Sequence, residues 1–194
     1  MERTPTQQTE SMHTQVGSPL YLPNAASTAQ HIWTEALEFC AQKMAIESTE
    51  GITARLEHDR AARQYCLYSV AKQTAAALGD LVPEIKAIYT LDYDATPHDL
   101  CFSHAGADAL PIHLIVWTGR KTAALDALIA SLDGALAQAG SEILATHGLV
   151  TLLDTQVIDD DDVDHQVGYG ALLSWIHHRP IQIWSRPPGS GSAS

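Results

Sequence analysis

Basic residues are scarce in this chain. Of its 194 residues, 11 are Lys or Arg and 23 are Asp or Glu, which gives a formal net charge of −12. A protein this acidic is poorly suited to neutralising phosphates over a broad surface, so we expect no nonspecific nucleic-acid binding. The excess is uneven, because residues 81–194 carry 14 acids and 5 bases. An acidic site is therefore expected in the second part of the chain.

Cysteines and long apolar runs are also few. Cys40, Cys66 and Cys101 are too widely spaced for a disulfide framework, so a reducing, cytoplasmic compartment is expected. The strongest apolar stretch, residues 112–117, is interrupted by His113, and the first 17 residues are polar. The sequence therefore predicts neither a signal peptide nor a membrane-spanning helix.

Several motifs that identify enzyme classes are missing. The chain contains no G-x-S-x-G, no P-loop, no H-E-x-x-H and no paired C-x-x-C. The acidic run Asp159–Asp164 does not fit a calcium loop, because His165 and Ala171 stand where the turn glycine and the bidentate glutamate belong. We expect this run to be a solvated loop.

A second apparent metal motif is the H-x2-C-x2-H spacing of His98, Cys101 and His104. On a strand, the two imidazoles and the thiolate would point to opposite faces and could not share a zinc ion. Cys101 is more simply interpreted as a small buried hydrophobe.

The first part of the chain predicts a helical hairpin over residues 27–80, after a disordered tail over 1–26. Trp33, Leu37, Cys40 and Met44 recur at helical spacing after an N-cap at Ser27 or Thr28, and this helix is expected to end near residue 47. The second helix is expected from about residue 51 to Gly79, which would end it.

The pattern changes after residue 81, and residues 81–186 predict an α/β domain followed by a flexible tail over 187–194. The expected strands are 84–92, 98–104, 111–118, 149–158 and 181–184, with a helix from Thr122 to a stop at Gly140 and a short one over 166–178. Alternation places Ile85, Ala87 and Tyr89 on one strand face. Asp126 and Asp133 flank the apolar stripe of the long helix. The predicted fold class is α/β (α+β): a mixed sheet backed by helices.

Four aspartates at strand ends or inside strands are the candidate metal ligands. Asp92, Asp94, Asp99 and Asp154 could hold Mg²⁺, because a carboxylate in a strand needs a cation, a base or a backbone cap as partner. The alternative interpretation of Asp94 is a solvated turn that caps residue 96.

In its organisation, the stretch 78–158 resembles the nucleotidyltransferases of the DNA polymerase β type. Lys86–Asp92 is similar to their first strand, Pro111–Val116 to the strand that carries D-x-D, and Leu152–Asp154 to the strand with the third carboxylate. The resemblance implies a two-metal site, yet the Gly-Ser pair after the first strand is absent, and Pro111 and His113 replace the first two acids. Of the metal ligands implied by the family, only Asp154 remains.

Three functional hypotheses follow. The first is a degenerate member of this superfamily, a pseudoenzyme that serves as a binding or assembly module for a nucleotide or protein, with His113 as a binding residue and no required cofactor. The second is a metal-dependent nucleotidyltransferase in which Asp92, Asp94, Asp99 and Asp154 form a rearranged Mg²⁺ site. The third is a structural homodimer formed through the helical hairpin, around Trp33, Leu37, Cys40 and Met44.

Overall fold

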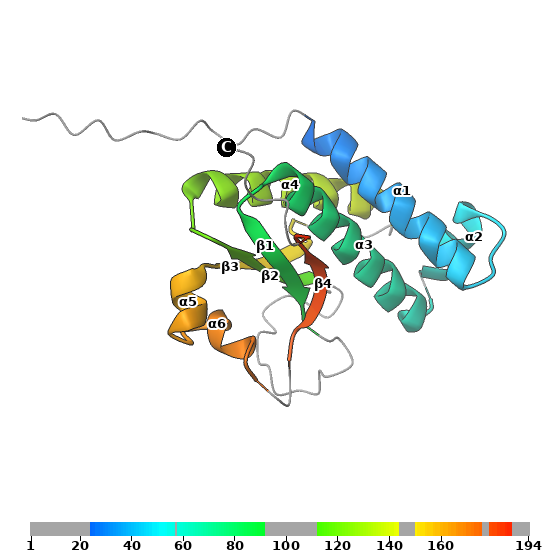
Figure 1. The fold of residues 1–194 in the computed structure, drawn as a ribbon. Helices are drawn as coiled ribbons and strands as arrows, with labels where there is room; N and C mark the ends of the chain where they lie inside the picture. The colour runs from blue at the N-terminus through cyan, green and yellow to red at the C-terminus, as the bar shows by residue number, and fades with distance from the viewer. Residues whose placement is uncertain (1–23, 57, 92–111, 144–149, 176–178, 188–194) are drawn as a thin grey trace, which may run out of the picture.

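A computed structural model describes residues 24–56, 58–91, 112–143, 150–175 and 179–187 of the chain (Figure 1). The elements in these ranges, in chain order, are α1 (Ala25–Lys43), α2 (Thr49–Leu56), α3 (Arg60–Leu81), β1 (Ile85–Thr90), β2 (Ile112–Thr118), α4 (Ala123–Ile143), β3 (Leu153–Ile158), α5 (Asp160–Asp164), α6 (Tyr169–Leu172) and β4 (Ile181–Ser185).

The strands form one mixed sheet in the order β3-β2-β1-β4. β1 runs antiparallel to both β2 and β4, whereas β2 and β3 are parallel and are joined through α4. β2 lies inside the sheet, as its run of apolar and β-branched residues predicts. The predicted fold class, a mixed sheet backed by helices, is confirmed.

Two layers cover the sheet. Helices α1, α3 and α4 gather on one side of it and α5 and α6 lie on the other (Figure 1). The larger core forms under the three long helices, because alternate β2 residues, Ile112, Leu114 and Val116, point towards them. The smaller core forms around Tyr89 and Ile115 on the opposite face.

The apolar stripe of α1 packs inside the chain. Trp33, Leu37 and Cys40 are buried in the larger core, and Met44 is half-buried against it. The Trp33 indole N–H also donates to the backbone oxygen of Leu136 in α4, at 3.0 Å. These residues are therefore occupied by contacts within the chain, and the homodimer through the helical hairpin stays a prediction.

The predicted hairpin differs from the structure at its boundaries. α1 begins at Ala25, inside the expected tail, because the side chain of Asn24, not Ser27 or Thr28, caps it by accepting from the Ser27 N–H at 3.2 Å. The expected second helix is two helices, α2 and α3. Asp59 begins α3 by accepting from the N–H of Ala62 at 3.1 Å.

Two glycines that predict helix ends have a different role. α3 continues past Gly79 to Leu81, and α4 continues past Gly140 to Ile143. A Cβ built at Gly79 would lie 2.2 Å from the indole of Trp184, and one at Gly140 would lie 2.6 Å from that of Trp33. Both glycines therefore allow an indole to approach the helix backbone closely.

β1 departs from the strict alternation that its sequence predicts. The register shifts between Ile85 and Ala87, so Ile85 joins Ile88 in the core under the long helices, while Ala87 and Tyr89 face the other side. A one-residue irregularity of this kind moves a side chain from one face of a sheet to the other.

The acidic run is not a solvated loop. Asp159 and Asp162 form a reciprocal capping box, with the side chain of each accepting from the backbone N–H of the other, and this begins α5. Lys86 Nζ lies 2.6 Å from an oxygen of Asp160, and Lys121 Nζ lies 2.5 Å from an oxygen of Asp162. The first ion pair therefore connects α5 to β1, and the second connects α5 to the segment that precedes α4.

These ion pairs affect the titration of both carboxyls. The Lys86 ammonium, with a smaller contribution from the indole N–H of Trp117, holds the pKa of Asp160 below its usual value. The Lys121 ammonium does the same for the pKa of Asp162. Within residues 166–175, which the structure describes, the only helix is the four-residue α6, so the helix predicted over 166–178 is wrong in its bounds.

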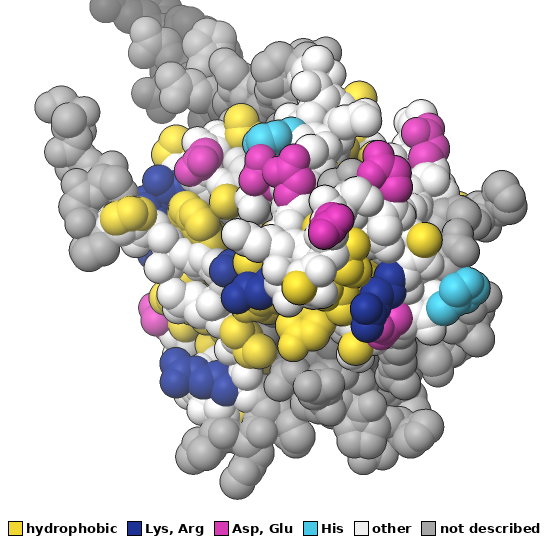
Figure 2. Space-filling model, turned by 90° about the vertical axis from the view of Figure 1, so that its right-hand side faces the viewer, with side chains coloured by type: hydrophobic (Ala, Val, Ile, Leu, Met, Phe, Trp, Pro, Cys, Tyr) yellow, Lys and Arg dark blue, Asp and Glu magenta, His cyan; other side chains and the backbone are white. Residues whose placement is uncertain are grey.

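Several predictions fall outside the described residues, namely the tail over 1–23, the strand over 98–104 and the end of the chain over 188–194. Among the described helices, none is both long and apolar enough to cross a membrane. The face shown in Figure 2 carries Lys and Arg side chains in separate places, interspersed with acidic and apolar ones. No continuous basic patch is visible on that face among the described residues.

Candidate functional site

The structure brings together two of the predicted site residues, His113 and Asp154. They occupy paired positions on the neighbouring parallel strands β2 and β3, so their side chains emerge side by side on the same sheet face. His113 Nδ1 lies 2.8 Å from Asp154 Oδ2, which is hydrogen-bonding distance. The two residues lie 41 positions apart in the chain, and only the register of β2 on β3 makes them neighbours.

This dyad lies on the face opposite the three long helices. Ile115, the next β2 residue on that face, belongs to the smaller core, so one side of the dyad is apolar. On β3, Gln156 Nε2 donates to Asp154 Oδ1 at 3.4 Å, a long contact. The His113 side chain is 29% exposed and that of Asp154 is 42% exposed. Both side chains are therefore accessible to a ligand.

The dyad fixes the imidazole. A carboxylate at Nδ1 holds a neutral histidine in the tautomer with the proton on Nδ1. The backbone is held as well, because Thr90 Oγ1 on β1 donates to the oxygen of His113 at 2.9 Å. The result is an oriented imidazole edge beside a partly exposed carboxylate. Such a pair can donate to or accept from a polar ligand group.

The proposed metal ligands are only partly accounted for. Asp92, Asp94 and Asp99 lie outside the described residues. Within the described ranges, no three His, Cys, Asp or Glu side chains gather closely enough to hold a metal ion. Asp154 with His113 offers one carboxylate and one imidazole, whereas Mg²⁺ prefers an oxygen-rich ligand set. The described part of the site therefore does not fit a magnesium centre.

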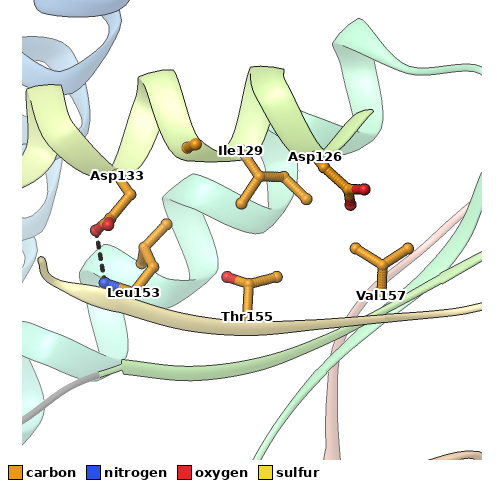
Figure 3. Close-up of a pocket in the computed structure, with 7 residues that line it drawn as sticks. Asp126, Ile129, Asp133, Leu153, Thr155 and Val157 are labelled. Atoms are coloured by element: carbon orange, nitrogen blue, oxygen red, sulfur yellow. Dashed lines mark hydrogen bonds between the residues drawn. The ribbon is translucent and has the colours of Figure 1, made fainter. Parts of the chain in front are cut away.

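One feature of the surface was not predicted as a site. α4 and β3 enclose a hollow of about 230 Å³, lined by residues of both elements (Figure 3). Asp126 and Asp133 contribute the carboxylates of this hollow. Their seven-residue spacing, which places both on one face of a helix, is the sequence feature that could have indicated the hollow. Thr155 on β3 could not be assigned to the hollow from sequence, because the side of the sheet that α4 covers is decided by tertiary packing.

Comparisons with known proteins identify no relative: no family model, no curated protein and no solved structure matches the chain.

Proposed function

We propose that the chain is a ligand-binding module, built on a core similar to that of the nucleotidyltransferases and lacking their two-metal chemistry. The element order α3, β1, β2, α4 and β3 supports the proposal. It is the order of helix, strand, strand, helix and strand on which the sequence resemblance rests. The ligand-binding centre is the dyad of His113 and Asp154.

The 2.8 Å contact between His113 and Asp154 carries this proposal. The resemblance places a metal-binding acid at position 113 and a third carboxylate at position 154. Two-metal transfer needs several carboxylates to fix the cations that neutralise the phosphates. Here an imidazole contacts the remaining carboxylate, and the pair suits hydrogen bonding to a ligand better than cation binding.

The ligand we favour is a nucleoside phosphate bound without a metal ion. An imidazole supplies an N–H donor, and a positive charge when protonated, both of which suit a phosphate oxygen. The neighbouring carboxylate keeps the ring in place and can accept from a sugar hydroxyl or a base amine. A protein partner on the same face is the competing occupant.

The test is thermal unfolding with ATP, GTP, CTP or UTP, each in EDTA and again with Mg²⁺. A ligand at 100 times its Kd stabilises the native state by about 2.7 kcal/mol, so binding raises the Tm measurably. We expect at least one nucleotide to raise the Tm in EDTA. His113→Ala and Asp154→Asn should abolish the shift, while Glu142→Gln, an exposed carboxylate of α4, should retain it.

Two results would overturn the proposal. A shift that survives both dyad substitutions would place the ligand elsewhere, and no shift with any nucleotide would leave a protein partner as the occupant. Mg²⁺-dependent transfer of labelled nucleotide, lost in Asp154→Asn, would instead favour the enzyme in which Asp92, Asp94 and Asp99 complete a metal site. The 42% exposure of the Asp154 side chain is the observation that keeps this second candidate open to test.

A further inference from the structure

The hollow between α4 and β3 has a polar end at each side and an apolar middle. Ile129 of α4 faces Leu153 and Val157 of β3 across it, and the carboxylates of Asp126 and Asp133 point from the helix towards the strand (Figure 3). β3 is an edge strand of the sheet, so the hollow opens at the side of the molecule. Pockets for drug-sized ligands typically exceed about 300 Å³, so this one suits a smaller or thinner molecule than a nucleotide.

The two carboxylates differ from the other paired aspartates of the chain. Asp160 and Asp162 each contact a lysine, but neither Asp126 nor Asp133 forms a direct ion pair with Lys, Arg or His among the described residues. Lys121, which precedes α4, contacts Asp162 and interacts with Asp126 only at longer range. The hollow therefore contains two carboxylates that form no direct ion pair with a side chain of the described structure.

A hydroxyl inside the hollow also lacks a partner. Thr155 Oγ1 is buried and makes no hydrogen bond within the described structure. A buried polar atom left without a partner costs about 1–3 kcal/mol, so a bound N–H or O–H group at this position would be favoured. In Figure 3 Thr155 lies between Asp126 and Asp133, beneath Ile129. The hollow therefore offers acceptors at both ends and one near its middle.

We propose that this hollow binds a linear aliphatic polyamine. Residues seven apart on a helix are separated by roughly 10 Å along its axis, which sets the distance between the two carboxylates. Three bonds of an extended chain span about 3.3–3.6 Å, so the nine bonds between the terminal nitrogens of spermidine span about 10–11 Å. Its end ammonium groups would pair with Asp126 and Asp133.

The remaining atoms of such a ligand also match the lining. Methylene groups would lie against Ile129, Leu153 and Val157, and the internal amine would donate to Thr155 Oγ1. Asp133 keeps its structural role, because its Oδ1 accepts the backbone N–H groups of residues 152 and 153, both at 2.7 Å. Its Oδ2 is the oxygen that would meet the ammonium. This site is independent of the His113 and Asp154 dyad.

The test is isothermal titration of the full chain with spermidine and with butylamine, in 150 mM salt. The chain has a net charge of −12 and attracts any polycation, so a matched control is essential. Asp126→Asn should weaken spermidine binding at least about tenfold, as the loss of a charge-assisted contact does. Thr155→Val should weaken it severalfold, and Glu142→Gln, the same change of charge elsewhere on α4, should leave it unaltered.

The outcomes separate the proposal from simple charge attraction. Equal weakening by Glu142→Gln and Asp126→Asn would overturn it, as would butylamine binding as tightly as spermidine. Asp126 is exposed, so its substitution should not prevent folding, which far-UV circular dichroism verifies. His113→Ala should bind spermidine as the natural chain does, so failure of the nucleotide proposal and failure of this one are distinguishable.

Discussion

Gly140→Ala is the substitution whose effect the structure predicts most sharply. In an ordinary helix this change is stabilising, because glycine costs up to about 1 kcal/mol relative to alanine. Here the added Cβ would lie 2.6 Å from Cζ2 and 3.2 Å from Cε2 of the Trp33 indole. Real Cβ atoms do not approach a carbon as closely as the first of these distances, so either the helix or the indole must move.

The indole has little room to move. Trp33 is 1% exposed, and its N–H donates to the backbone oxygen of Leu136, one turn before Gly140 on the same helix. Overpacking a core of this kind costs about 1–3 kcal/mol. After the gain in helix propensity, we expect Gly140→Ala to destabilise the fold by about 1–2 kcal/mol. In a chain of this length, that lowers the Tm by roughly 2–8 °C.

The control is Gly134→Ala in the same helix. No atom lies within 4 Å of the Cβ position at Gly134, so this variant should gain about 0.5–1 kcal/mol. Urea unfolding followed by far-UV circular dichroism measures both changes as shifts in midpoint at constant slope. A second check is Trp33→Phe, which removes part of the obstructing ring and should reduce the cost of Gly140→Ala. If Gly140→Ala stabilises the protein as Gly134→Ala does, the close approach of Trp33 is refuted.

Three further predictions concern charges and thiols. Asp133→Ala removes the acceptor of two backbone N–H groups at the start of β3, so urea unfolding should show a loss of about 1–3 kcal/mol. Because the pKa values of Asp160 and Asp162 are lowered in the fold, their contribution is present above about pH 3.9 and is lost as the pH falls through the folded values. The double variant with Asn at both positions should therefore lose less Tm than the natural chain on acidification below that pH. A hydrogen bond to Cys40, together with burial, raises the pKa of the Cys66 thiol, so peptide mass spectrometry should find Cys66 unalkylated by iodoacetamide until urea is added.

The elements predicted best are those whose pattern repeats over many residues. The apolar stripe of α4 and the β-branched run of β2 lie where the sequence predicts them, within a few residues at each end. Periodicity identifies these elements because the same face is buried along their whole length. Gly140 shows the limit of this reasoning. A glycine near the end of a helical pattern suits both a helix end and a close contact, and only the position of Trp33 decides between them.

The sequence predicts the two residues of the dyad but not their contact. Asp154 is a carboxylate inside a predicted strand and His113 interrupts an apolar one, so each was a candidate by itself. Their contact depends on the register of β2 on β3, which places residue 113 opposite residue 154. A shift of that register by one residue would point Asp154 and His113 to opposite faces. No pattern within either strand determines this register.

The acidic residues show why function was harder to predict than fold. In the sequence, neither Asp160 nor Asp126 has a basic residue at helical spacing. In the structure, Asp160 meets Lys86, which lies 74 positions away, and acts as a tether for α5. Asp126 forms no direct ion pair in the described part of the chain and faces a hollow. Whether a carboxylate holds the fold together or can accept a ligand thus depends on which distant residues the fold brings to it, and the carboxylates left without a cation are the first candidates for binding.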